Sequence, residues 1–188
     1  MKKCILCLSI FFIITSINSQ EKIKLDLKKS SITWEGSMLF GFGKHDGTVK
    51  FKEGEVIVKD SKIRKGSFVI DMNSIKSNET ETWVEDLIEH LKNKDFFDVK
   101  NNPTTKIFFT KIKYVGDGYV QITADLTINK ITKSVFFVAN QDNVKRQLKA
   151  RLKIDRTDWN INYNSQGKTS VKDQIISDAI SFKINLNF

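Results

Sequence analysis

The sequence predicts an all-β fold with one main helix, and two observations carry this prediction. Apolar and polar residues alternate along most of the chain, most clearly at Ile180, Phe182, Ile184, Leu186 and Phe188. Side chains on a strand point to opposite faces at every second residue, so each such strand buries one face, which indicates antiparallel sheet. Short turn signals separate the strands, which favours closure into an up-and-down barrel, with a two-sheet sandwich as the alternative.

The expected strands cover nearly the whole chain after residue 30. Besides the C-terminal strand they are 31–37, 47–52, 55–59, 62–72, 105–115, 120–128, 134–141 and 148–154. Glycine, aspartate and asparagine between alternating segments are typical of hairpin turns. We therefore expect hairpins at Glu53-Gly54-Glu55, Gly116-Asp117-Gly118 and Gln141-Asp142-Asn143.

One helix is expected over 82–92. Its apolar residues recur at helical spacing, and they are Trp83, Val84, Leu87, Ile88 and Leu91. Thr82, followed three residues later by Glu85, predicts a capping box at the start of this helix. In a barrel, such an amphipathic helix lies either across an open end or along the outer wall.

The N-terminus is typical of a secretory signal peptide. Two lysines precede an apolar segment, Cys4 to Ile14, that is too short to span a bilayer, and Ile17-Asn18-Ser19 fits a cleavage site. We expect a signal peptide at 1–19 and one β-barrel domain at 20–188, in a periplasmic or secreted protein without a stable membrane anchor. Both cysteines lie in the signal segment, so the mature chain would have neither thiol nor disulfide chemistry.

The net charge is moderately positive. It is +9 for the full chain and falls to +7 without Lys2 and Lys3. The lysines are spread along the strands rather than clustered, so we interpret the charge mainly as a contribution to solubility, and we expect no nucleic-acid partner. The alternative is a binding module whose basic exterior engages anionic envelope polymers or a protein partner.

The sequence shows no catalytic set, cofactor motif or metal site. His45 and His90 are far apart, whereas zinc needs three or four converging ligands. We expect His45 to be solvated or structural, with Asp46 as a possible partner, and Asp155 to form a surface ion pair with its neighbour Arg156. A rival hypothesis makes His45 or a carboxylate the base of an enzyme that acts on a bound hydrophobic substrate.

The chain is rich in phenylalanine, with fourteen residues. The interior of a small barrel is either filled by side chains or left with a cavity for one small ligand, and the alternation pattern is compatible with both. Asp95-Phe96-Phe97-Asp98 follows the expected helix. Two adjacent rings in an extended segment point in opposite directions, so we expect one to be buried while its neighbour faces another apolar surface, such as a ligand.

Six segments occur in a characteristic order from about Ser30 to the C-terminus. They are Ser31-Ile32-Thr33-Trp34; His45-Asp46-Gly47-Thr48-Val49; Gly66-Ser67-Phe68-Val69-Ile70-Asp71 with Ser74-Ile75; Leu91 to Val99 with Asn102-Pro103-Thr104; Asp125 to Lys133; and Arg156-Thr157-Asp158-Trp159. Together they resemble the YceI-like family of exported or periplasmic proteins. Trp159-Asn160-Ile161 departs from the Phe-Gly that is commoner there, which concerns the local turn geometry.

The resemblance implies an extended eight-stranded antiparallel lipocalin-like β-barrel that encloses an apolar chain, either a polyisoprenoid or a fatty-acyl-type lipid. It implies no enzymatic activity and no cofactor, and a homodimer is possible. The residues in matching regions are the expected ligand contacts, with ordinary core packing as the alternative for each. They are Phe68, Ile70, Leu87, Leu91, Phe96, Phe97 and Phe108.

Overall fold

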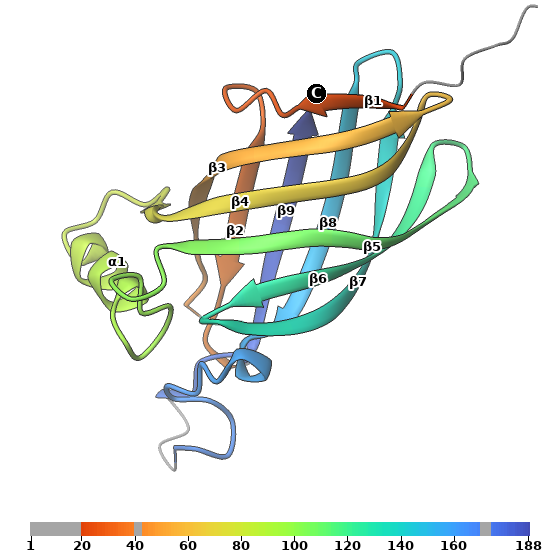
Figure 1. Ribbon diagram of the computed structural model, residues 1–188. Coiled ribbons are helices and arrows are strands. Elements are labelled where there is room, and N and C mark those ends of the chain that lie inside the picture. The colour runs from red at the N-terminus through yellow and green to blue at the C-terminus, as the bar shows by residue number, and fades with distance from the viewer. Residues whose placement is uncertain (1–19, 40–42, 170–173) are drawn as a thin grey trace, which may run out of the picture.

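The computed structural model describes residues 20–39, 43–169 and 174–188 (Figure 1). The expected signal peptide at 1–19 lies outside the described residues. The elements in chain order are β1 (Glu21–Lys24), β2 (Ser31–Gly36), β3 (His45–Lys59), β4 (Lys62–Ser77), α1 (Val84–Lys92), β5 (Thr104–Gly116), β6 (Tyr119–Ile128), β7 (Ile131–Asp142), β8 (Gln147–Asp155), the 3-10 helix η2 (Arg156–Trp159) and β9 (Ala179–Asn187).

The strands form a closed antiparallel barrel, as the sequence predicted. The sheet order is β1-β3-β2-β9-β8-β7-β6-β5-β4, and a further pairing of β3 with β4 closes it. The short strands β1 and β2 pair with different stretches of β3, so they share one position and the barrel wall has eight strands. The sandwich alternative is excluded by this closure.

The two ends of the barrel differ. At one end, here called the helix end, lie α1 and the segments 93–103, 156–169 and 174–178. At the other, here called the far end, lie β1 and the turns that join β3 to β4, β5 to β6 and β7 to β8 (Figure 1). Because every strand of a meander reverses direction, residues near 36, 45, 77, 104, 128 and 155 all reach the helix end.

The hairpin expected at Glu53-Gly54-Glu55 is wrong, because β3 continues through it to Lys59. The register of β3 with β4 shifts between Phe51 and Glu53, which marks a bulge. A Cβ atom on Gly54 would lie 2.6 Å from Cδ1 of Phe68, so this glycine admits a packed ring rather than a turn. The turn comes at Asp60 and Ser61, whose φ angles of 53° and 58° are left-handed.

The other two expected hairpins are confirmed. β5 ends at Gly116 and β6 begins at Tyr119, with Gly116 and Gly118 both at positive φ. β7 ends at Asp142, and the turn that follows reaches β8 at Gln147. A further tight turn at Asn129 and Lys130, also at positive φ, joins β6 to β7 within the segment Asp125 to Lys133.

The helix is confirmed, but its predicted cap is not. α1 begins at Val84, Trp83 is its N-cap, and no side-chain capping hydrogen bond is found among the described residues. Its acidic first turn and basic last turn, with Glu85, Asp86 and Lys92, suit the helix dipole. Ile88 and Leu91 pack against the core of the barrel. The helix lies beyond the ends of β4 and β5 (Figure 1), across the helix end and not along the outer wall.

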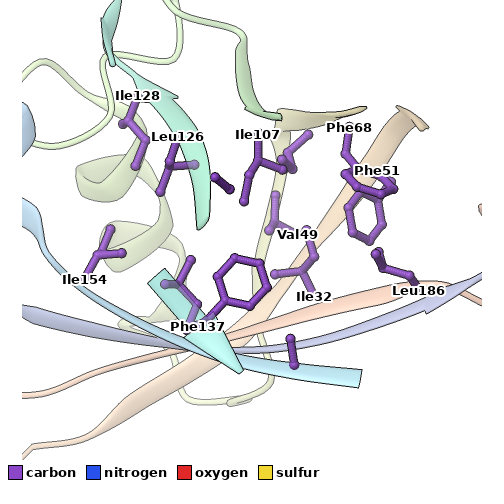
Figure 2. Packing of buried hydrophobic residues seen from close by; sticks show 14 of the residues in the cluster. Ile32, Val49, Phe51, Phe68, Ile107, Leu126, Ile128, Phe137, Ile154 and Leu186 are labelled. Carbon is purple, nitrogen blue, oxygen red and sulfur yellow. The ribbon is translucent and has the colours of Figure 1, made fainter. Parts of the chain in front are cut away.

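The inward side chains of all strands meet in one apolar core (Figure 2). Toward the far end this core is tightly filled, with Val56, Ile63 and Val120 almost fully buried. Phe68 lies beside Phe109 with ring centroids 5.3 Å apart, and a Cβ atom on Gly66 would lie 2.5 Å from Cδ2 of Phe109. Gly66 is therefore needed for the rings to meet.

A polar cluster near the far end joins three strands around Tyr114. The backbone N–H of Ile63 donates to Tyr114 Oη at 2.6 Å, and the hydroxyl donates to Gln141 Oε1. Gln141 Nε2 in turn donates to the carbonyl of Ser61 at 2.9 Å. Burial of the hydroxyl raises the pKa of Tyr114, because an ionised phenol would lose hydration.

We predict that Gly66→Ala destabilises the barrel by about 1–3 kcal/mol, because the added methyl group overlaps two rings that cannot both move aside. Urea unfolding followed by circular dichroism measures the change. Gly36→Ala is the matched control, since a Cβ atom there meets nothing within 4 Å, and we expect a change of less than about 0.5 kcal/mol. Equal effects of the two substitutions would contradict the packing argument.

The raised pKa of Tyr114 predicts a loss of stability at alkaline pH. The stabilisation is complete below the unfolded-state pKa of about 10 and is lost as the pH rises through the folded-state pKa, because only the unfolded chain ionises readily. Tyr114→Phe removes this dependence and costs about 1–3 kcal/mol at pH 7, since Ile63 and Gln141 lose a partner. The free energy of unfolding, measured from pH 8 to 11, tests this. If it falls equally with pH in the two proteins, the role of Tyr114 is refuted.

Candidate functional site: an apolar cavity in the barrel

The barrel encloses a cavity of about 260 Å³. A buried water needs only about 10–15 Å³ on the same kind of measure and also needs two to four polar partners. The cavity is instead lined almost entirely by aliphatic and aromatic side chains from every strand between β2 and β9. The lining includes Ile32, Val49 and Phe137, which converge on the interior in Figure 2. The interior is therefore only partly filled by side chains.

Six of the seven predicted site residues line this cavity. Phe68 and Ile70 come from β4, Leu87 and Leu91 from α1, and Phe96 and Phe97 from the segment after α1. The strands thus supply the wall, while the helix and the segment behind it cover one end. That these residues contact a ligand stays a prediction.

Phe108 is the exception, and its predicted place at the cavity is wrong. Its side chain is 46% exposed, and it pairs with Ser67 and Asp125 on the outer face of the sheet. Its neighbour Phe109 points inward, is buried and lines the cavity. The alternation of Ile107 and Phe109 on the inner face settles this choice.

The segment Asp95 to Asp98 is a turn and not an extended segment, so the expectation of one buried ring is also wrong. Both Phe96 and Phe97 are buried, and both line the cavity. The backbone N–H of Phe97 donates to the carbonyl of Leu91 at 3.2 Å, which folds the chain back onto the helix. Asn129 Nδ2 donates to the carbonyl of Phe96 at 3.0 Å and ties this turn to the β6–β7 hairpin.

Arg156 holds the helix end together from inside. Its side chain is 1% exposed, so the surface ion pair expected with Asp155 is wrong. Its guanidinium donates to the carbonyls of Ile161, Ile176 and Ser177 at 2.7–3.2 Å. Nη2 also lies 3.1 Å from Asp178 Oδ1. Burial lowers the pKa of Arg156 from its ordinary value, and Asp178 opposes that shift.

The turn after Arg156 is closed by Asn160. Asn160 has a φ of 60°, a left-handed conformation that asparagine adopts more readily than most residues. Trp159 is buried, and its Nε1 donates to the carbonyl of Leu126 at 3.2 Å. The corner is thereby fixed to β6.

The few polar groups of the cavity gather toward the helix end. His45 lines the cavity, and its Nδ1 lies 3.2 Å from Glu79 Oε2, so its partner is Glu79 and not Asp46. Trp34 lines the cavity from β2 and is 8% exposed, yet its Nε1 has no hydrogen-bond partner among the described residues. A buried N–H without a partner costs about 1–3 kcal/mol.

The described residues hold neither a metal site nor a membrane-spanning helix. Over 20–39, 43–169 and 174–188, no group of three or more His, Cys, Asp or Glu side chains could hold a metal ion. In the same ranges, no helix has both the length and the apolar character needed to cross a membrane.

Many residues that line the cavity are not among the predicted contacts, although the sequence carries a signal for them. Strand alternation places Phe51, Phe109, Leu126 and Phe137 on the inner face, and all four line the cavity. The alternation does not predict which inward residues touch across the barrel and which are separated by the cavity.

The adjacent phenylalanines give a matched test of this geometry. We predict that Phe109→Ala destabilises the protein by about 3–5 kcal/mol, because it removes a ring packed between Phe68 and Phe137. Phe108→Ala removes the same atoms from the outer face and should cost less than about 1 kcal/mol. Chemical denaturation measures both, and a larger cost for Phe108→Ala would overturn the assignment of faces.

Comparison with known proteins agrees with this geometry. The model of the YceI-like domain matches residues 23–188. A UPF0312 protein of Pseudomonas putida is 30% identical over 123 residues, which are 64% of this chain and 61% of that protein. A UPF0312 protein of Pseudomonas aeruginosa is 32% identical over 114 residues, 60% of this chain and 52% of that protein. The matches thus span between half and three fifths of these relatives.

Solved structures show the same fold. BcnA of Burkholderia cenocepacia is similar with a TM-score of 0.69 and 20% identity, covering 86% of this chain and 98% of that one. A mutant CJ YceI protein with a monobromobimane guest is similar with a TM-score of 0.54 and 15% identity, covering 100% of this chain and 98% of that one. Since the domain model matches nearly all of the described residues, the chain belongs to the YceI-like family.

Proposed function

We propose that this protein is a non-catalytic carrier that holds one hydrophobic chain, of polyisoprenoid or fatty-acyl type, in the barrel cavity. The observation that carries the proposal is the apolar cavity of about 260 Å³ within a closed barrel. Water is a poor occupant of such a space, because it finds few hydrogen-bond partners there. An apolar chain is a good occupant, because each buried methylene contributes about 0.8 kcal/mol.

The cavity also suggests how such a chain would be oriented. The far end is filled by side chains such as Val56 and Ile63, whereas the unpartnered Trp34 Nε1 and the His45–Glu79 pair lie toward the helix end. The apolar tail would therefore occupy the interior, and a polar head would lie near Trp34. A head-group oxygen there would accept the indole hydrogen bond that the protein does not satisfy.

The proposed setting is the periplasm or the exterior of the cell. The basic and apolar N-terminal segment supports export, as does membership of the YceI-like family. In that setting a carrier would shield a water-insoluble chain during transfer or storage.

Native mass spectrometry of the protein purified from its own host tests the proposal. We expect a bound hydrophobic mass that organic extraction recovers. We also expect the extracted protein to bind a fluorescent fatty acid, and the recovered compound to displace it. A clean unliganded mass, together with no fluorescent-lipid binding, would end the carrier proposal.

Ala150→Phe provides a variant that acts on the cavity itself. Ala150 lies on the inner face of β8 and lines the cavity, so a phenyl ring there occupies space that the ligand needs. We predict at least a tenfold weaker fluorescent-lipid affinity, equal to about 1.4 kcal/mol. Ser67→Phe adds the same ring to the exposed outer face of β4 and should bind like the parent protein. Comparable losses in both variants would show that the effect is not specific to the cavity.

A further inference from the structure

One outer wall of the barrel exposes an unusual number of large apolar side chains. Phe136 is 61% exposed, Tyr119 52% and Val138 45%, and they lie on neighbouring positions of β6 and β7. Phe108 and Val115 on β5 are similarly exposed. None of the large apolar residues that are exposed in the described chain belongs to β3 or β4. Among the described residues, five of the nine exposed large apolar side chains thus lie on β5, β6 and β7.

Strand register places cations on both sides of these apolar residues. Val138 lies opposite Gln121, which lies opposite Lys113 on β5. On its other side, Val138 lies opposite Arg151, which lies opposite Lys183 on β9. One row across the outer wall thus runs from a lysine through an apolar centre to an arginine and a second lysine.

The rows on either side of this one repeat the pattern. Tyr119 lies opposite Asn140, which lies opposite Lys149 on β8. Phe136 lies opposite Thr123, which lies opposite Lys111 on β5. A shallow groove also crosses this wall, and Tyr119, Val138 and Lys149 are among the residues that line it.

The charge of this wall is largely uncompensated. Strands β5 to β9 carry eight lysine or arginine residues and three carboxylates, and two of those carboxylates, Asp142 and Asp155, stand at strand ends. The ion pairs found among the described residues include none of these eight cations. Unpaired surface cations interact favourably with an anionic partner at little cost, because no existing ion pair has to break.

We infer that this face, defined by Tyr119, Phe136 and Val138 with their flanking cations and here called the docking wall, binds the surface of an anionic lipid bilayer. Lysines and arginines near such a surface are attracted to its acidic head groups. Aromatic and aliphatic side chains between them enter the boundary between head groups and acyl chains. A soluble anionic polymer would satisfy the cations but would leave the apolar centre in water, so a lipid surface fits both halves of the docking wall. The binding is peripheral and reversible, and it does not depend on what the cavity holds.

Co-sedimentation with vesicles tests this inference. The vesicles contain phosphatidylcholine with about one third phosphatidylglycerol, at about 0.1 M salt, where charges act over about 10 Å. We expect the protein to bind these vesicles and to bind pure phosphatidylcholine weakly. The triple variant Lys149→Glu, Arg151→Glu, Lys183→Glu should lower the partition coefficient at least about tenfold.

The matched control is Lys50→Glu, Lys52→Glu, Lys65→Glu. These lysines are exposed on β3 and β4, away from the docking wall, and the change in net charge is the same. We expect this variant to keep most of the vesicle binding. Equal losses in the two triple variants would show that net charge and not the docking wall drives association, and would overturn the inference.

The apolar half of the docking wall needs its own variant. Phe136→Ser with Val138→Ser leaves every charge in place, so a lipid surface should bind it several-fold less tightly, whereas a soluble polyanion such as dextran sulfate should bind it unchanged. Unaltered vesicle binding by this double variant would refute a lipid surface and point to polymer binding. Circular dichroism and fluorescent-lipid binding in solution, unchanged in all variants, separate loss of docking from loss of fold or cavity.

Discussion

The pairing of β3 with β4 is the constraint on which the rest of the structure depends, because it turns a meander into a barrel. Once the sheet is closed, every strand has one inner and one outer face, and a register slip by one residue would exchange them. An eight-stranded barrel has an interior just wide enough to be filled by side chains or to hold one small ligand. Which outcome occurs depends on a few inward residues. Gly54 and Gly66 let Phe68 and Phe109 meet, and both rings line the free space that remains.

Much of the fold could be predicted from the alternation of apolar and polar residues, because a half-buried strand leaves that pattern in the sequence. The failures are at positions where one residue type serves two purposes. Gly54 looks like a turn residue, but its lack of a side chain makes room for Phe68 within a continuous strand. Thr82 followed by Glu85 fits a capping box, yet the N-cap of α1 is Trp83, one residue later. Neither choice can be made without knowing which distant residue packs there.

In the candidate site, too, local sequence predicts some residues, whereas others depend on contacts with distant parts of the chain. Strand alternation supports Phe68 and Ile70 as inward residues, and applied to β5 it selects Phe109 over Phe108. Phe96 and Phe97 lie outside any strand, so no period applies, and the turn that buries both rings is fixed by contacts with α1 and with Asn129. Arg156 is the clearest case. A charged residue beside Asp155 predicts a surface pair, whereas the carbonyls that enclose it come from residues up to 21 positions away.

The two ends of the cavity are held by different kinds of interaction, and this bears on exchange of an apolar ligand. The wall and the far end combine strand hydrogen bonds with fully buried side chains such as Val56 and Val120. None of the residues of α1, which lies wholly within the described chain, is fully buried, so separating it from the barrel exposes less apolar surface than parting two strands. Arg156 ties the segments of the helix end to one another, and its guanidinium also lies over the ring of Phe96, which follows α1. The helix end beside α1 is therefore where opening of the barrel exposes the least apolar surface.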